Sequence, residues 1–344
     1  MSEMKVDNTL SPHGGELVQR FISNKSEALK LAESCECTMP IRGMAARDVI
    51  NIAYGFFTPL QGFMTSEEVE NVCANMTLPS GYVWPLPIVF DVSDEEIANY
   101  KIDVGKNILL EYHNLPFAVL HVEDIFNYDL NLMARQVCGM DMVDHPGIKL
   151  IHSYKDKFIG GKIDLINPPV FHEPFGQFFF TPQELRAKFA RRHWKKVVAY
   201  HSRTVPHVGH EWLMKAAWFQ HNAKAVLVSC AIGQKKVGEC IDETIVLGHG
   251  ELLNSGYFKE STYLTSIFLW DKRFAGPREA ILHAIVRKNL GCTGHVFGPG
   301  HAGVEGYYEK WASHSAFKGI PDLGIEPLFV QEWFFCLHCN EVAY

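Results

Sequence analysis

The segment Val197–Lys215, which reads VVAYHSRTVPHVGHEWLMK, constrains the fold more than any other part of the chain. An apolar run that ends in a polar loop, followed at once by a helix expected over His207–Asn222, is typical of one step of a parallel sheet. The pattern continues with a strand at Ala223–Ile232, a helix at Pro277–Asn289 and a strand over Thr293–Phe297. Strands that alternate with helices predict an α/β domain built of parallel crossover units.

The preceding part of the chain has a different pattern. Short β-rich runs separated by Gly and Pro extend from Ile41 to about Leu165, which predicts a barrel-like or mixed β domain. One helix is expected there, over Thr65–Asn75, because carboxylates follow its first residues. The stretch Ile159–Gly176, rich in Gly and Pro, marks the boundary, and Thr181-Pro182 then begins another helix.

Composition excludes several classes of protein. The 344 residues suffice for about two domains, and the net charge of −7 argues against a protein that coats nucleic acid. No apolar run approaches the ~18 residues needed to span a bilayer, and the polar N-terminus, residues 1–15, has no signal segment. Nine cysteines without such a signal predict reduced thiols and a cytoplasmic protein. We therefore expect neither a nucleic acid nor a membrane as partner.

The loop after the first predicted strand carries Arg203, His207 and His210. In open parallel sheets, ligands bind where the strands end, and a helix start favours an anion such as phosphate. Imidazole and guanidinium donors would add hydrogen bonds to the same anion. This is the layout expected for nucleotidyl transfer, which stabilises a leaving pyrophosphate without a covalent nucleophile. From spacing alone, the histidine pair could instead bind a metal or cap the helix.

Residues 298–303, GPGHAG, match the dinucleotide fingerprint G-x-G-x-x-G, with Asp322 about 20 residues further on. A dehydrogenase is the obvious alternative. It is disfavoured because the following segment is interrupted by Gly306 and the match comes late in the chain.

Arg278 lies in the first turn of a predicted helix, where its positive charge opposes the helix dipole. It therefore either faces an anion, a partner or a carboxylate, or is a solvated surface residue.

Four stretches in order resemble one family. They are GFFTPLQGFM (Gly55–Met64), SRTVPHVGHEWLMK, RFAGPREAILHAIVRKN and GPGHAGV. Together they are similar to the motifs of ATP sulfurylases (sulfate adenylyltransferases), most closely the prokaryotic forms. The resemblance implies a PUA-like β-rich domain over 1–165 and a Rossmann-like α/β nucleotidyltransferase domain over 172–318. It also implies a small C-terminal module over 319–344, which looks like a truncated zinc ribbon.

The resemblance also implies an enzyme and its site. ATP and sulfate would give adenylyl sulfate and pyrophosphate, or the reverse, with Mg²⁺ on the nucleotide and in-line attack on the α-phosphate. Arg203 would hold sulfate with the backbone N–H of Ala302, while His207 and His210 would hold the phosphates. The other substrate-binding positions would be His201, Thr204, His301 and Gly303. A homo-oligomer is implied because members of the family commonly assemble.

The chain departs from the family pattern inside the site. The loss of the family's arginine, which is Pro299 here, matters most. Losing one charge-assisted hydrogen bond to phosphate would slow the reaction roughly 10–200-fold. Three explanations remain open: a working enzyme with a rearranged pocket, a relative that uses another oxyanion or runs in reverse, and an impaired paralogue that only binds nucleotide or adenylyl sulfate. The family's Gln is His201, its Asn is Thr204, its Thr is Ser202, its Arg is Pro299 and its Asp is Gly300.

At the C-terminus, Cys336 and Cys339 form a C-x-x-C pair of the kind that binds zinc in the family. A tetrahedral site needs four ligands, so His338 or a remote residue would have to complete it. The alternative is two thiols without a metal.

Overall fold

The computed structural model describes residues 10–344, so part of the polar N-terminus lies outside the described residues. These residues form two compact units. The N-terminal unit comprises Glu16–Pro169 and Arg273–Leu282, and the C-terminal unit comprises residues 10–15, 170–272 and 283–344. Both units contain non-contiguous stretches of chain, and the domain ranges 1–165, 172–318 and 319–344 stay a prediction.

The N-terminal unit is built on a seven-stranded sheet in the order β1-β4-β5-β7-β2, with β3 and β6 also paired to β7. Only the pair of β1 and β4 is parallel among these ladders. This is the mixed β domain expected from the sequence. The strands are β1 Cys37–Pro40, β2 Gly62–Phe63, β3 Phe90–Val92, β4 Asn107–Tyr112, β5 Leu115–His121, β6 Asp124–Phe126 and β7 Lys157–Leu165.

The same unit contains more helix than the sequence predicted. The expected helix is confirmed: the N–H of Thr65 donates to the Glu68 carboxylate at 2.9 Å, which closes a capping box. The expectation of a single helix is wrong, since further helices form in this unit, among them α2, which is buried at most positions from Ala46 to Ala53. The helices are α1 Lys25–Glu33, α2 Gly43–Ala53, α3 Ser66–Asn75, α4 Asp94–Tyr100, α5 Leu130–Cys138 and α6 Pro146–His152.

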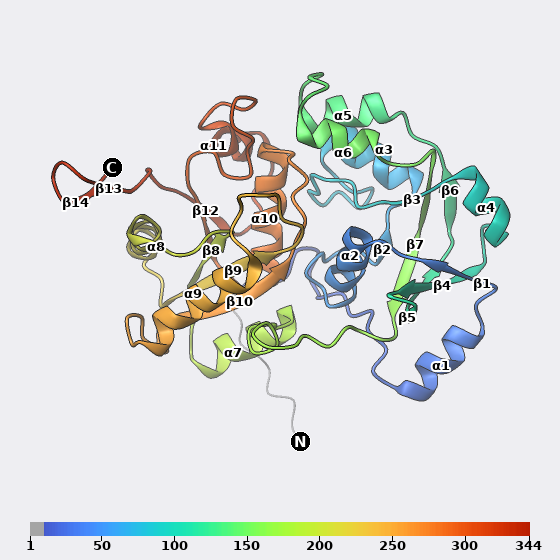
Figure 1. Cartoon of the computed structure of the whole chain (residues 1–344), viewed down its shortest axis with the longest axis horizontal. Helices are drawn as coiled ribbons and strands as arrows, with labels where there is room; N and C mark the ends of the chain where they lie inside the picture. Colours follow the sequence, from blue (N-terminus) through green and yellow to red (C-terminus); the bar gives the residue numbers. More distant parts are fainter. Residues whose placement is uncertain (1–9) are drawn as a thin grey trace. The chain divides into compact units, whose positions relative to one another are not determined.

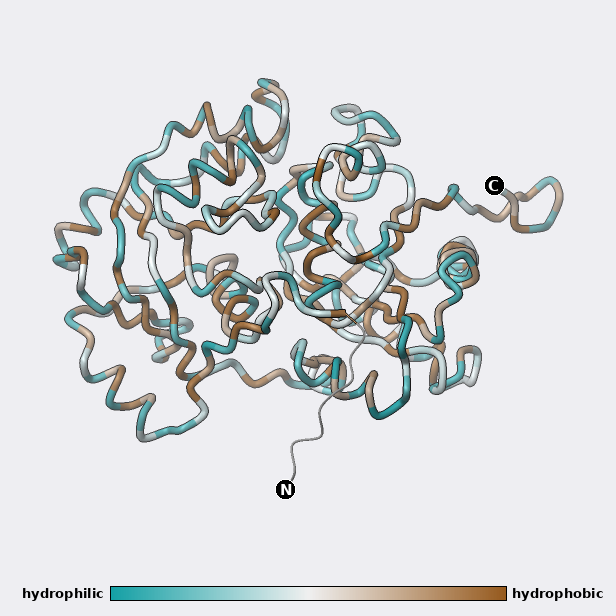
Figure 2. Tube along the Cα trace, turned by 180° about the vertical axis from the view of Figure 1, so that it is seen from behind, coloured by the Kyte–Doolittle hydropathy of each residue, from teal (hydrophilic) through white to brown (hydrophobic). Residues whose placement is uncertain are grey.

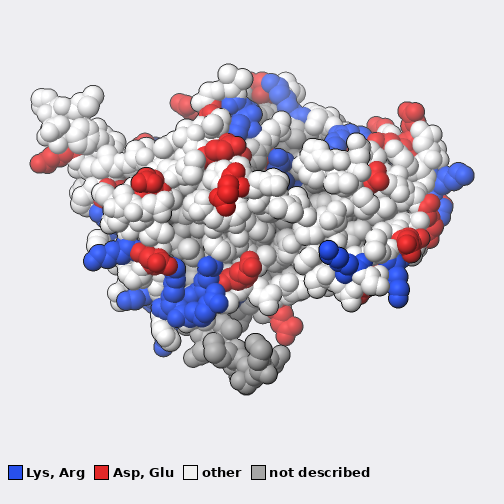
Figure 3. Space-filling model, turned by 60° about the horizontal axis from the view of Figure 1, so that its bottom comes forward, with Lys and Arg blue, Asp and Glu red and all other residues white. Residues whose placement is uncertain are grey.

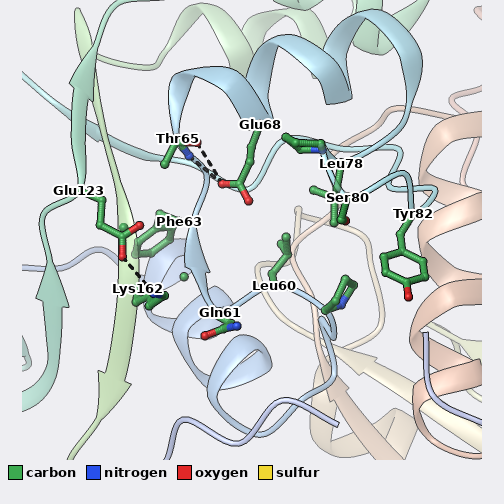
Figure 4. A pocket seen from close by; sticks show the side chains of 14 residues that line it. Leu60, Gln61, Phe63, Thr65, Glu68, Leu78, Ser80, Tyr82, Glu123 and Lys162 are labelled. Atoms are coloured by element: carbon green, nitrogen blue, oxygen red, sulfur yellow. Dashed lines mark hydrogen bonds and ion pairs between the residues drawn. The ribbon is translucent and has the colours of Figure 1, made fainter. Parts of the chain in front are cut away.

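A hollow of about 410 Å³ lies in this unit between β2, β7 and the start of α3 (Figure 4). Its charged groups already have partners: Glu68 caps α3, and Glu123 pairs with Lys162 at 3.6 Å. Gly161 is required behind it, because its φ is +151° and a Cβ there would lie 1.9 Å from the carbonyl oxygen of His121. The hollow thus contains a satisfied ion pair and a cap, with no cluster of nucleophiles or histidines.

The C-terminal unit is built on a five-stranded sheet in the order β10-β9-β8-β11-β12 (Figure 1). Every neighbouring pair is parallel, as the alternating sequence predicts. The strands are β8 Val197–Ser202, β9 Ala225–Ile232, β10 Tyr263–Leu269, β11 Gly294–Phe297 and β12 Glu326–Phe329. The helices are α7 Pro182–Arg191, α8 Val208–Gln220, α9 Asp242–Asn254 and α11 Ala312–Ala316, with a 3₁₀ turn at Phe317–Gly319. The helix α10, Pro277–Asn289, belongs to the N-terminal unit up to Leu282 and to this unit from His283.

The predicted strands β8, β9 and β11 and the helices α7, α8 and α10 are confirmed within two residues at each end. The hydroxyl of Thr181 accepts from the Glu184 N–H at 3.2 Å, with Pro182 as the first helical residue. All seven residues of β10 are buried. In Figure 2, hydrophobic segments gather in the interior of the trace. Burial on both faces is what makes these strands continuous apolar runs.

The chain ends in a two-stranded hairpin, β13 Phe334–Cys336 and β14 Glu341–Ala343, which projects from the rest of its unit (Figure 1). Cys336 and Cys339 lie at its turn, where the N–H of Cys339 approaches Cys336 Sγ at 3.5 Å. Among residues 10–344, no group of three or more His, Cys, Asp or Glu side chains is placed to hold a metal ion. The predicted zinc site is therefore not supported.

None of the helices in the described part of the chain is long and apolar enough to cross a lipid bilayer.

Acidic and basic side chains are interspersed over the face drawn in Figure 3, apart from one gathering of Lys and Arg at its lower left. In the sequence, the densest basic segment is 188–196, which ends α7 and leads into β8. That segment precedes β8, so it lies at the edge of the sheet where this strand begins. The predicted site lies where β8 ends.

Candidate functional site

The carboxyl edge of the five-stranded sheet carries a row of cations. β8, β9 and β10 are adjacent and parallel, and Arg203, Lys235 and Lys272 follow their respective ends. Since the carboxyl ends of parallel strands meet at one edge, these three side chains converge there. Sequence reasoning found Arg203 and missed both lysines, although each follows an apolar strand by three residues.

Carboxylates hold these cations in place. Arg203 Nη2 lies 3.8 Å from Glu239 Oε2, Lys272 pairs with the same carboxylate, and Lys235 Nζ lies 2.7 Å from Asp242 Oδ1. Burial alone raises the pKa of Glu239, but hydrogen bonds from Lys272 and the Lys236 backbone outweigh it and lower that pKa to about 2. Glu239 is therefore ionised at neutral pH and contacts two of the three cations at this edge.

The helix start beyond Arg203 holds the predicted histidine pair. His207 is the N-cap of α8, and its Nδ1 accepts from the Gly209 N–H at 3.1 Å. The His207 and His210 rings stack with centroids 3.7 Å apart. Burial, followed by the proximity of His207, lowers the pKa of His210 to about 4, so this ring is neutral at pH 7. The structure thus brings the pair together at the helix N-terminus, where N–H groups favour an anion.

A cavity of about 260 Å³ borders His207. Its walls are mainly apolar, with one carboxylate from Glu211. They are formed by Pro206, His207, Val208, Glu211, Met214, Leu252, Tyr257 and Phe258.

Four further histidines surround a buried arginine next to this edge. We call this the inner cluster: His201, His283, His295, His301 and Arg287. The His201 and His283 rings stack at 4.3 Å, and His283 Nδ1 lies 3.0 Å from His301 Nε2. His295 Nδ1 lies 3.0 Å from the carbonyl oxygen of Ala199. The cluster joins residues from β8, α10, β11 and the loop after it.

The histidines of the inner cluster are neutral at physiological pH. Burial is the main cause, and neighbouring positive groups add to it: the pKa values of His201, His283 and His295 lie well below 6.5, and that of His301 falls to about 3. His201 therefore offers hydrogen bonds and no positive charge. Sequence reasoning had left both roles open for the histidine that replaces the family's glutamine.

The second predicted loop forms a tight turn. The Gly303 N–H donates to the Gly300 carbonyl at 2.9 Å, and Ala302 has a φ of +57°. Ser313 Oγ donates to the His301 carbonyl at 2.5 Å and fixes the loop from the other side. The next α-helix starts only at Ala312, so the G-x-G-x-x-G match does not open a helix as a dinucleotide site requires.

Successive side chains of β8 point to opposite faces of the sheet, so its last two residues contact different helices. Ser202 Oγ lies 2.8 Å from His249 Nε2 on α9, while His201 contacts Arg287 on α10. His201 lies in β8, and Arg203 is the first residue after the end of that strand. The charge of Arg203 is the last of several causes that lower the pKa of His283, after burial and other groups of the inner cluster. Thr204 is exposed, and its carbonyl accepts from the Ser202 hydroxyl at 3.1 Å.

Sequence reasoning missed His249, His283, His295 and Arg287. The only local signal was the high number of histidines, 17 in the chain.

Arg278 has a role that differs from those the sequence suggested. Its guanidinium donates to the carbonyls of Val72 and Cys73 at 3.0 and 2.9 Å, within the N-terminal unit. It is a packing residue that binds neither an anion nor a carboxylate in these contacts.

Comparison with known proteins gives a consistent result. A family model described as ATP-sulfurylase matches residues 176–344, and one described as a PUA-like domain matches residues 10–168. The sulfate adenylyltransferase of Hyperthermus butylicus is 40% identical over 335 residues, covering 96% of this chain and 84% of the relative. That of Thermococcus onnurineus is 37% identical over 330 residues, covering 96% and 84%.

A solved structure titled hexameric APS kinase from Thiobacillus denitrificans aligns with a TM-score of 0.74. At 21% identity it shows a shared fold alone, and the match covers 97% of this chain and 59% of that chain.

Proposed function

The chain belongs to the ATP-sulfurylase family, and from this premise we propose that it transfers the adenylyl group of ATP to sulfate, or runs the same reaction in reverse. A sulfate oxygen attacks the α-phosphorus in line, the bond from that phosphorus to the bridging oxygen breaks, and pyrophosphate leaves with the electron pair. The observation that supports the proposal is that His201, Arg203 and the stacked His207–His210 pair occupy the end of β8 and the loop and helix start that follow it.

The roles follow from charge and position. Arg203 binds sulfate with the backbone N–H of Ala302, and His201 donates to the same oxyanion. His207 and His210 bind the phosphates at the start of α8, where the helix dipole favours the leaving pyrophosphate. Thr204, His301 and Gly303 shape the surrounding loops. Lys235 and Lys272 add positive charge at the sheet edge in a chain that has Pro299 where the family has an arginine.

Mg²⁺ would enter with ATP. Carboxylates at the sheet edge are already paired, Glu239 with Lys272 and Asp242 with Lys235, which fits a metal bound mostly by phosphate oxygens and water. When bound there, Mg²⁺ neutralises charge on the departing pyrophosphate. We further infer a cytoplasmic homo-oligomer, supported by the absence of disulfides in residues 10–344 and by the hexameric structural neighbour.

The test is release of pyrophosphate by the full chain with Mg-ATP and sulfate, and formation of ATP from adenylyl sulfate and pyrophosphate. Arg203→Ala should lower kcat/KM for sulfate about 10–200-fold through loss of a charge-assisted hydrogen bond. Arg192→Ala is a matched control, since Arg192 follows α7, away from the site, and pairs with Glu260 there. Equal activity of the two variants would contradict the assignment of Arg203.

His207 needs a variant that spares the helix. His207→Asn keeps a side-chain acceptor at the N-cap but removes the imidazole. We expect it to fold like the parent and to lose most pyrophosphate release. Unchanged turnover would remove His207 from the phosphate site.

A second candidate is a paralogue that binds nucleotide without turnover. It is favoured by Pro299 and Gly300, which provide no charged side chain in the second loop. Tight binding of adenylyl sulfate by calorimetry, with neither direction of the reaction detectable, would establish it in place of the enzyme.

A further inference from the structure

Arg287 is a buried cation of the inner cluster. Its side chain is fully buried, yet no carboxylate among residues 10–344 forms an ion pair with it. One nitrogen, Nη2, donates to His201 Nδ1 at 2.6 Å and to Ser229 Oγ at 3.0 Å. Nε and Nη1 are buried without any hydrogen-bond partner, and the guanidinium lies 4.8 Å from the centre of the Phe268 ring. A buried cation left without a counter-ion is costly, which points to a negative ligand nearby.

The contact with His201 determines which nitrogen of that ring carries the proton. Burial lowers the pKa of Arg287 to about 9, so the guanidinium is still charged at pH 7 and can only donate. Nδ1 of His201 must then be the bare, accepting nitrogen. A neutral imidazole with a bare Nδ1 has its proton on Nε2. A protonated His201 would place two N–H groups against each other and is excluded.

Nε2 of His201 faces outward. It has no hydrogen-bond partner among the described residues, yet it is absent from the buried nitrogens that lack a partner, so it is accessible to solvent in a partly exposed residue. Arg203 follows His201 by two positions and is the first residue beyond the end of β8. The N–H donor therefore lies at the strand end that leads into this guanidinium, and Arg287 contacts the other nitrogen of the same ring.

We propose that Arg287 is a positioning residue: by donating to Nδ1, it holds His201 in the tautomer whose Nε2–H donates to the oxyanion substrate. The inference rests on the proposed function for the identity of that oxyanion. An amide side chain has a fixed donor, whereas a histidine at this position can present either a donor or an acceptor. Arg287 removes this choice and places a fixed positive charge behind the donor.

The tautomer is measurable without turnover. In the full chain with ¹⁵N-labelled histidine, the ring that disappears in a His201→Gln variant identifies His201. We expect a pyridine-type shift for Nδ1 and a pyrrole-type shift for Nε2 at pH 7. A protonated Nδ1, or an imidazolium, would overturn the inference whatever the activity of the protein.

Variants of Arg287 test the cause. Arg287→Met should let both tautomers of His201 appear, and Arg287→Lys, which keeps a cationic donor, should restore the parent tautomer. Ser229→Ala is the matched control, because it removes the other hydrogen bond of Nη2 without touching His201. If Arg287→Met fails to fold, the other two variants still test the assignment. Arg287→Lys and Ser229→Ala should both show the tautomer of the parent protein. A folded Ser229→Ala variant that loses this tautomer would contradict the assignment.

Sulfate binding completes the test. Adding sulfate should shift the Nε2 resonance of the parent protein, and Arg287→Met should raise KM for sulfate about 2–10-fold while KM for ATP stays unchanged. A mixed tautomer with unchanged KM would overturn the positioning role. If the parent protein shows no turnover, the proposed function fails on its own, while the sulfate-dependent shift of Nε2 still decides the inference.

Discussion

Two buried arginines, one in each unit, have their charge balanced in opposite ways. Arg273 of the N-terminal unit donates to both oxygens of Asp48, at 2.7 and 2.6 Å. Arg287 of the C-terminal unit has a neutral histidine and a serine as hydrogen-bond partners. The first cation is compensated by the protein itself. The second is surrounded by uncharged donors and acceptors, an arrangement suited to a ligand that supplies the negative charge.

Lowering the pH should produce the largest loss of stability, and it should act on the C-terminal unit, which contains Arg287. The unfolded histidines have a pKa near 6.5, whereas burial lowers the folded value to about 3 for His249 and His301. The unfolded chain therefore binds more protons below pH 6.5, and stability falls as the pH drops from there toward 3. One pKa unit corresponds to about 1.4 kcal/mol per group, so several buried histidines together should unfold the protein within this window.

Denaturant unfolding at pH 7.5, 6 and 5 measures this loss. A His249→Leu variant should show a shallower dependence on pH, because one depressed histidine is absent. A free energy of unfolding that stays flat between pH 7.5 and 5 would mean that these rings are protonated in the folded protein.

The Asp48–Arg273 pair should give the next largest effect. Asp48→Ala leaves the Arg273 guanidinium buried without its carboxylate, which should cost about 3–5 kcal/mol of unfolding free energy. Asp94→Ala is the control in the same unit, since its carboxylate is 69% exposed and pairs with Lys157, and it should cost below about 1 kcal/mol. Similar losses in both variants would show that Arg273 does not depend on Asp48.

The smallest effect should be an increase in the free energy of unfolding when an anion binds, and it should act through the C-terminal unit, which contains Arg287. At a sulfate concentration 100 times Kd, the parent protein should gain about 2.7 kcal/mol. Arg203→Ala should lose most of this gain, and Asp48→Ala should keep it. Thermal unfolding in sulfate against chloride at equal ionic strength is the measurement. Equal gains in both variants would indicate a general salt effect.

The sequence was informative where one local signal was enough. Thr181-Pro182 predicted the start of α7, and the alternation of apolar runs and helices predicted the parallel sheet and the loop with Arg203, His207 and His210. It was uninformative where a contact spans the chain. Arg287 is 86 positions from His201, and nothing in a helix that ends RKN indicates that its arginine is buried. The helix α2 was missed although its polar and apolar residues alternate with a helical period.

The row of lysine and arginine at the sheet edge also affects how a substrate arrives. The whole chain has a net charge of −7, so at very low salt its distant field repels a nucleotide polyphosphate. At physiological ionic strength the Debye length is about 8 Å, and an approaching anion then responds mainly to the nearest charges, which are Arg203, Lys235 and Lys272 and the carboxylates of Glu239 and Asp242 paired with them. Moderate salt thus favours encounter by hiding the rest of the molecule, which is the reverse of what a uniformly basic enzyme would experience.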